Sequence, residues 1–266
     1  MENLLLAQLR EALPQGMRVP SELEALYAWI EANGFYDDAG GRRRGYLYPQ
    51  DRLQQSWSDD ERKGGTDIVF FTDEPKNRDE ELRYWFYGED RELAAEIKQR
   101  LCVFAGSGSE GSMCALWLDD AGETKIVHMG SGSGSTMTCI LTHSGLDFLR
   151  LLAIGYDEIC WGEDFSAPPN SEDDDFIVHP NVKFQQWVTQ TFKTTIPQTA
   201  LELVTPAHLD DENPSDEFLI WVNRVAEWWQ ALLYFKSLFG SWVCARRAAS
   251  AKQLGAEASY FAPLSQ

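Results

Sequence analysis

Two glycine- and serine-rich runs have the residue types that come closest to a cofactor site. Residues 106–111 spell G-S-G-S-E-G, the G-x-G-x-x-G spacing of a dinucleotide-binding turn. Such a turn needs a helix that begins at its last glycine and receives the pyrophosphate, and an acidic residue about 20 positions further on. Only eight residues separate Gly111 from Asp120, and they are strand-like. We therefore interpret this run as a β-turn.

The second run, residues 130–136, spells G-S-G-S-G-S-T and offers backbone N–H groups to a phosphate. It lacks the lysine of a P-loop, and no clear helical pattern follows it directly. We interpret it as a loop between the sheet and a helix. Neither run contains G-x-S-x-G, so no nucleophile elbow is predicted. The sequence therefore predicts no cofactor.

The histidines and cysteines show no metal-binding spacing. There is no H-E-x-x-H and no C-x-x-C among the four histidines and five cysteines, so no metal site is predicted. The odd, scattered cysteines indicate reduced, mostly buried thiols. A Cys/His pair would meet only in the folded chain, and a hydrolase that uses Cys114 or Cys160 is one alternative. No set of nucleophile, base and orienting group is legible, so we predict that the chain is not an enzyme.

Negative charge is concentrated in one part of the chain. The net charge is −19, and residues 151–223 contain 14 Asp or Glu and two Lys, for a local charge of −12. This field repels nucleic acid and anionic membranes and speeds encounter with a basic protein. We predict a protein partner, no nucleic acid and no membrane; the alternative is that the acidity only maintains solubility. The predicted partner-binding residues are Glu163, Asp164, Asp173, Asp174, Asp175, Asp210, Asp211 and Glu212.

Other features bear on location and partners. No apolar run reaches the roughly 18 residues of a membrane span, and Glu2 stands where a signal peptide carries basic residues. We expect a cytoplasmic protein. Arg42, Arg43 and Arg44 would suit a phosphate or an acidic patch, but in an overall negative field they are weak evidence for nucleic-acid binding.

Hydrophobic periodicity predicts an α+β fold, a mostly antiparallel sheet packed with helices. Helices are predicted at about 4–13, 20–33, 89–100, 182–192, after a cap at Thr142, and from Ser215 over five turns. Strands are predicted at 67–71, 101–105, 113–118 and 125–128, with a turn at 119–123. A polar, glycine-rich loop is expected at 37–65. Residues 1–205 are predicted to form one domain, on which a helical C-terminal extension, 206–266, packs.

Several motifs occur in a characteristic order. They are V-P-S-E-L at 19–23, V-F-A-G-S-G-S at 103–109, A-L-W-L at 115–118, I-V-H-M-G-S at 126–131 and D-F-L-R-L-L-A-I-G-Y at 147–156. In this order the chain resembles the SUKH superfamily, bacterial relatives of the yeast cell-wall-synthesis regulator, over roughly residues 18 to 200. Residues 37–90 and those after 205 do not match clearly.

The resemblance implies an α+β fold and, for many bacterial members, an immunity protein that neutralises a secreted toxin, often a nuclease. The family has no catalytic residues to carry over, and its partners bind through variable surfaces, so no contact residue is implied. The alternative function is an intracellular regulatory or scaffold protein of the same fold without a toxin partner.

Overall fold

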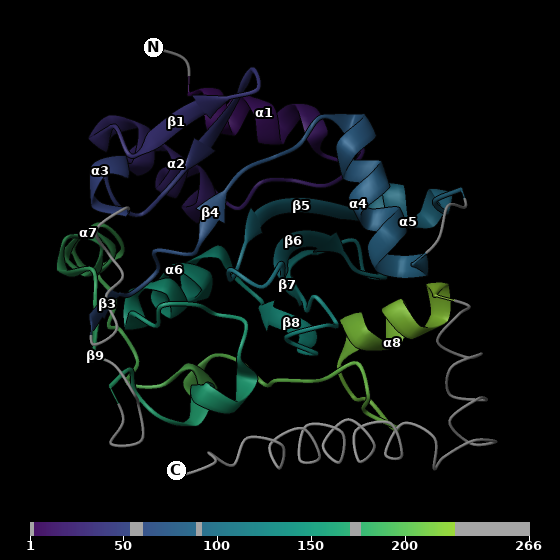
Figure 1. The fold of residues 1–266 in the computed structure, drawn as a ribbon. Helices are drawn as coiled ribbons and strands as arrows, with labels where there is room; N and C mark the ends of the chain where they lie inside the picture. Colours follow the sequence, from purple (N-terminus) through teal and green to yellow (C-terminus); the bar gives the residue numbers. More distant parts are fainter. Residues whose placement is uncertain (1–2, 54–60, 89–91, 171–176, 227–266) are drawn as a thin grey trace, which may run out of the picture. The chain divides into compact units, whose positions relative to one another are not determined.

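An antiparallel sheet of seven strands organises the protein (Figure 1), which we describe from a computed structural model over residues 3–53, 61–88, 92–170 and 177–226. The strand order is β1-β2-β4-β5-β6-β7-β8. The predicted α+β class is therefore confirmed. The strands are β1 (Tyr36–Ala39), β2 (Arg42–Gly45), β4 (Val69–Phe70), β5 (Leu101–Gly106), β6 (Met113–Leu118), β7 (Thr124–Met129) and β8 (Thr138–Thr142). A separate parallel pair consists of β3 (Glu61–Lys63) and β9 (Ile177–His179).

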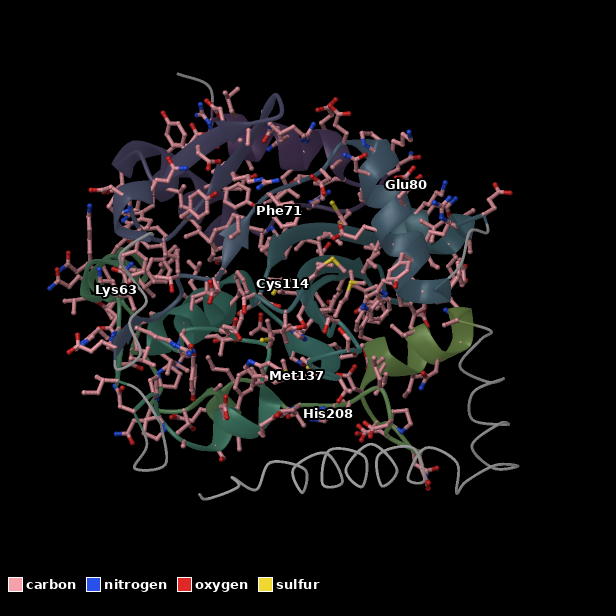
Figure 2. All side chains as sticks on the ribbon, viewed as in Figure 1. Lys63, Phe71, Glu80, Cys114, Met137 and His208 are labelled. Atoms are coloured by element: carbon pink, nitrogen blue, oxygen red, sulfur yellow. The ribbon has the colours of Figure 1, made fainter. Side chains whose placement is uncertain are left out.

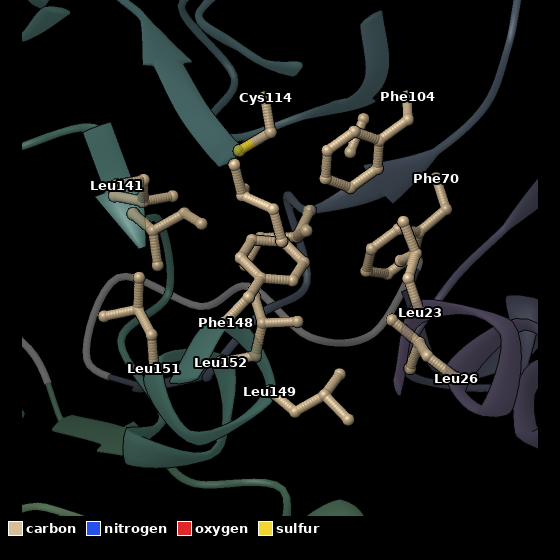
Figure 3. Close-up of a cluster of buried hydrophobic side chains, with 14 of the residues drawn as sticks. Leu23, Leu26, Phe70, Phe104, Cys114, Leu141, Phe148, Leu149, Leu151 and Leu152 are labelled. Carbon is tan, nitrogen blue, oxygen red and sulfur yellow. The ribbon is translucent and has the colours of Figure 1, made fainter. Parts of the chain in front are cut away.

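One face of the sheet packs against three helices, α1 (Leu4–Ala12), α2 (Ser21–Asn33) and α6 (Gly145–Ile154), and α7 (Val182–Phe192) packs against α6. Figure 3 shows the apolar side chains that fill this layer. Phe104 of β5 meets Phe148 of α6 with ring centroids 5.6 Å apart. Tyr27 of α2 meets Phe70 of β4 at 6.0 Å. These edge-on contacts join the helices to the central strands.

The opposite face packs against α4 (Pro75–Tyr87), α5 (Ala95–Arg100) and α8 (Glu217–Val225). Trp117 of β6 lies 5.4 Å from the Phe218 ring and 5.7 Å from the Trp221 ring, both on α8. The central strands are thus buried on both sides, and a strand buried on both sides reads as an uninterrupted apolar run. This explains why strands 101–105, 113–118 and 125–128 were predicted correctly.

The prediction of a loop at 37–65 is wrong. β1 and β2 form a hairpin, α3 (Gln50–Leu53) follows, and β3 lies near the end of the segment; residues 54–60 fall outside the described part. Gly40 and Gly41 have φ of 61° and 81°, as a two-residue hairpin turn requires. This hairpin forms the end of the sheet, where charged residues protect an exposed edge. Its polar sequence was therefore mistaken for a loop.

The predicted helices agree with the observed helices to different degrees. α1, α2 and α7 match their predicted spans closely. Of the predicted 89–100 helix, residues 95–100 form α5, residues 92–94 are not helical, and residues 89–91 lie outside the described part. α4 and β8 were not predicted. α6 is capped by Ser144, whose side chain accepts from the N–H of Asp147, and not by Thr142. The loop predicted for residues 130–136 lies between two strands, β7 and β8, and not between the sheet and a helix.

The predicted C-terminal extension begins within the α+β unit. Residues up to Val225 form one compact unit, and α8 packs on β8. The predicted continuation of this helix through Trp229 and Leu233 lies outside the described residues. Among the helices that the structure describes, none has the length and hydropathy needed to cross a membrane.

Candidate partner-binding site

β8 is the last strand of the sheet, and its outer edge is covered by the chain that leads to α8. The N–H of Thr138 donates to the carbonyl of Ala207 (2.7 Å), and the N–H of Leu209 donates to the carbonyl of Thr136 (2.9 Å). Between them, Met137 and His208 form an isolated antiparallel bridge (Figure 2). Backbone pairing therefore fastens residues 207–209 to the sheet and blocks pairing of this edge with another chain.

Asp216 fastens the other end of this segment. One carboxylate oxygen accepts from the N–H of Ile140 in β8 (2.9 Å), and the other accepts from the N–H of Leu219 (2.9 Å). The second bond is a helix N-cap, which fixes the point where α8 begins. Burial raises the pKa of this carboxyl above its ordinary value. The loop 210–215 is thus held at both ends.

A hollow of about 670 Å³ opens between this loop and β8. We call it the acidic hollow. Its carboxylates are those of Asp211, Glu212, Asp216 and Glu217, and Ile140 and His143 close its inner side. Asp211 also accepts from the N–H of His208 (2.9 Å), which shapes the turn. Four carboxylates consequently surround a cavity whose walls are fixed by hydrogen bonds to the sheet.

The predicted residues Glu163 and Asp164 lie next to this region. They belong to the 3-10 helix η1 (Gly162–Ser166), and both are exposed. Gly162 packs so closely on Pro206 that a β-carbon there would lie 3.0 Å from the Cβ of Pro206, which also lines the hollow. The short 3-10 helix η2 (Ala200–Glu202) contacts η1 as well. Two acidic segments about 45 residues apart in sequence thus adjoin each other in the fold.

Most of these carboxylates have no cationic partner among the described residues. In the part that the structure describes, the exposed side chains of Glu163, Asp210, Glu212 and Glu217 form no ion pair or hydrogen bond. The predicted Asp173, Asp174 and Asp175 lie outside the described residues. Five of the eight predicted residues therefore lie in or beside one region. Asp216 and Glu217 join them, although the sequence suggested only that they begin a helix.

A second set of polar residues is buried and was missed from the sequence. The hydroxyl of Ser107 lies 2.8 Å from Nε2 of His128, and Nδ1 of His128 lies 2.8 Å from the carbonyl of Met137. Since a carbonyl only accepts, Nδ1 donates and Nε2 accepts from Ser107. This is the geometry of a nucleophile and its base, but both side chains are 0% exposed. Burial lowers the pKa of His128 to about 4, so the imidazole is neutral near pH 7. Its two hydrogen bonds join the turn that follows β5 to the segment that precedes β8.

The cysteines of the hydrolase alternative lie in unreactive surroundings. Cys114 and Cys160 are both buried, and burial raises the pKa of each thiol. Cys160 also donates to the carboxylate of Glu158 (3.5 Å), which further disfavours a thiolate. The thiolate is the nucleophilic form of cysteine. These two positions therefore lack the electropositive, accessible setting of a catalytic thiol.

The same Glu158 fastens the first glycine-rich run. Its carboxylate accepts from the backbone N–H and the hydroxyl of Ser109, both at 2.7 Å, and from the indole N–H of Trp161 at 2.7 Å. The run lies between β5 and β6, so the interpretation of residues 106–111 as a turn between strands is confirmed. The carboxylate thus already accepts from the backbone N–H of Ser109, which a phosphate bound to this turn would need as a donor.

The described residues contain no group of three or more His, Cys, Asp or Glu side chains that could hold a metal ion. Comparisons with family models, with curated proteins and with solved structures found no match. The acidic hollow, through its geometry and its charge, is therefore the structural feature that bears most directly on function.

Proposed function

We propose that this chain is an immunity-type protein, which neutralises a secreted bacterial toxin by binding it through the acidic hollow and the neighbouring residues Glu163 and Asp164. The observation that carries the proposal is a set of four exposed carboxylates in or beside a cavity of fixed walls, those of Glu163, Asp210, Glu212 and Glu217, which form no ion pair or hydrogen bond within the described residues. The resemblance to the SUKH superfamily supports the same role. A basic toxin, such as a nuclease, has the complementary charge.

The lack of cationic partners for Glu212 and Glu217 among the described residues has an energetic consequence. Glu212 and Glu217 line one cavity, so bringing their like charges together is unfavourable until a cation arrives. Because Asp216 holds the loop in place, a partner meets carboxylates that are already positioned, and little conformational freedom is lost on binding. Opposite charges at such a surface mainly raise the association rate and select the partner.

Inhibition follows from chemistry shared by carboxylates and phosphates. A nuclease binds the phosphates of its substrate with arginine and lysine side chains, which pair with carboxylates in the same forked geometry. The carboxylates of Asp210, Asp211 and Glu212 would take the place of the phosphates. The substrate then loses access to the toxin's cationic groups.

The test uses the full chain and the product of the adjacent gene, which on this proposal is the toxin. We expect co-expression of this chain to restore growth to cells that produce the toxin. The triple variant Asp210→Asn, Asp211→Asn, Glu212→Gln should lower the association rate at least tenfold at low salt, because it removes three of the charges that steer the encounter. Association with the variant should also depend less steeply on salt.

A matched control removes three charges elsewhere. Glu11, Asp51 and Glu92 are exposed and have no ion pair in the described part of the chain, and the variant Glu11→Gln, Asp51→Asn, Glu92→Gln should change the rate by no more than about twofold. Equal effects of the two triple variants would show that only net charge matters. If the neighbouring gene product is not toxic or does not bind, the immunity role fails, and the regulatory or scaffold alternative gains support.

A further inference from the structure

The three consecutive arginines are divided between two faces of the sheet by the alternation of β2. Arg43 points to the same face as Gly45, where a β-carbon would lie 2.7 Å from Leu5 of α1. Its guanidinium donates to Asp38 (Nε to Oδ1, 2.8 Å) and lies 3.4 Å from the carboxylate of Glu31 in α2. Arg42 and Arg44 therefore point to the opposite face, away from α1 and α2.

Neither of these two arginines has a carboxylate partner within the described residues. Arg42 donates from Nε to the carbonyl of Thr72, which fixes its guanidinium without neutralising it. Arg44 is exposed and forms no ion pair. Asp37 lies opposite Arg44 in the strand register, and its carboxylate accepts from the hydroxyl of Tyr46 (3.1 Å). Two guanidinium groups are thus left without a carboxylate partner in a chain with a net charge of −19.

Both arginines line a hollow of about 230 Å³ between β2 and the start of α4, which we call the arginine hollow; Arg43 also borders it, but its guanidinium is paired with Asp38 and Glu31. Its other side is formed by residues 71–74 and Asn77, and includes the carboxylates of Asp73 and Glu74. No ion pair joins Asp73 or Glu74 to Arg42 or Arg44. The hollow therefore has guanidinium groups on one wall and carboxylates on the other, without direct neutralisation between them.

We propose that the arginine hollow binds a small zwitterion, whose carboxylate or phosphate group contacts Arg42 and Arg44 and whose ammonium group contacts Asp73 and Glu74. A guanidinium matches both kinds of oxyanion with two parallel hydrogen bonds. Arg42 is already oriented by Thr72, so less side-chain freedom is lost on binding. The separated carboxylates favour a ligand with an ammonium group over a simple anion. This site is independent of the proposed toxin-binding function.

The test is calorimetric titration of the full chain at constant ionic strength. The zwitterionic probes are phosphoethanolamine and β-alanine, and the matching simple anions are inorganic phosphate and acetate. We expect saturable binding of at least one zwitterion, at least about tenfold tighter than its matching anion, because the anion makes no ionic contact with the carboxylate wall. The tighter of the two zwitterions identifies the oxyanion.

Three variants separate the two walls. Arg44→Gln should weaken both the zwitterion and its anion, roughly tenfold. Asp73→Asn should weaken the zwitterion alone. Arg18→Gln is the matched control, since Arg18 is exposed, has no ion pair in the described part and lies outside the arginine hollow; it should change neither affinity. Arg44→Lys keeps the positive charge but cannot form two parallel hydrogen bonds with an oxyanion. It replaces Arg44→Gln in the test if Arg44→Gln does not fold.

Several outcomes would overturn the proposal. The first is that neither zwitterion binds saturably. The second is that Arg18→Gln and Arg44→Gln lower the ligand affinity equally. The third is that Asp73→Asn tightens binding of the simple anions and does not weaken binding of the zwitterion. None of these results would affect the proposed immunity role, because the toxin-binding variants change a different part of the molecule.

Discussion

The acidic hollow and the arginine hollow lie near opposite ends of the seven-stranded sheet, beside β8 and beside β2. In the acidic hollow the charged residues belong to a loop, so neighbours such as Asp211 and Glu212 face the same cavity. In the arginine hollow they belong to a strand: all three arginines border it, but alternation directs the Arg43 side chain to Asp38 and Glu31, away from Arg42 and Arg44. A run of like charges therefore forms one patch on a loop but is divided between two faces on a strand.

The two hollows also differ in how they are held in place. The position of the acidic hollow depends on the packing of α8 against the sheet and on the hydrogen bonds that Asp216 accepts from Ile140 and Leu219. The arginine hollow depends on a hairpin whose inner face is anchored by Arg43 to Asp38 and Glu31. The first is anchored by burial and caps and the second by partly exposed ion pairs, so substitutions should cost more stability at the first.

Removal of the apolar anchor of α8 should have the largest effect. Phe218 is 0% exposed and contacts Trp117 and Trp221. Phe218→Ala should lower the free energy of unfolding by about 3–5 kcal/mol, because it leaves a cavity beneath α8. Urea unfolding measures this loss, with Ile220→Ala, an exposed position on the same helix, as the control. An equal loss of unfolding free energy in the two variants would contradict the packing of α8 on the sheet through Phe218.

Loss of the Asp216 carboxylate should cost about 1–3 kcal/mol, because Asp216→Ala removes a helix cap and leaves the N–H of Ile140 without its acceptor. Asp216→Asn keeps one acceptor oxygen and should recover part of the loss. Hydrogen exchange at the Ile140 amide gives a local measurement, and we expect faster exchange in the alanine variant. Unchanged protection there would argue against the cap as the anchor of the loop.

A third measurement uses pH and a residue outside both hollows. Burial, with smaller contributions from Glu158 and Asp157, raises the pKa of Asp67 to about 7, and burial raises that of Glu81 to a similar value. A raised pKa in the folded state means that the protonated form is favoured on folding, so the stabilisation is present at low pH and is lost as pH rises through about 7. The unfolded carboxyls titrate at about pH 4, so the free energy of unfolding should fall between about pH 4 and pH 7 and level off above that range.

Asp67→Asn should flatten part of this decline, and Asp67→Asn combined with Glu81→Gln should flatten more of it. Urea unfolding at several pH values measures both slopes. A slope identical to that of the unchanged chain in the double variant would show that neither carboxyl has a raised pKa in the folded protein.

The smallest effects are expected at the arginines. Arg44→Gln should change the free energy of unfolding by less than about 0.5 kcal/mol, because Arg44 is exposed and unpaired in the described part of the chain. Arg43→Gln should cost about 1 kcal/mol, because it breaks contacts with Asp38 and Glu31. Thermal melts of the two variants compare these neighbours directly. A larger loss at Arg44 would reverse the assignment of faces on β2.

The amino-acid sequence by itself determined the elements whose signal is local. The continuous apolar runs of β5, β6 and β7 and the helical spacing of α2 and α7 depend on residues within one or two turns of each other, so they were predicted with nearly correct bounds. The concentration of acidic residues after position 151 was visible as well. Composition is read without knowledge of the fold, and for that reason it could point to eight acidic residues, of which five lie in or beside the acidic hollow.

Only the tertiary structure decided which distant residues meet. The approach of Gly162 to Pro206 and the pairing of Ser107 with His128 join segments 44 and 21 residues apart, and no local pattern specifies such contacts. The β1–β2 hairpin was missed because a polar strand at the end of a sheet gains its stability from its neighbours and not from its own composition. The sequence alone showed three adjacent arginines, and the sheet determined that Arg43 pairs with Asp38 and Glu31 while Arg42 and Arg44 have no carboxylate partner among the described residues.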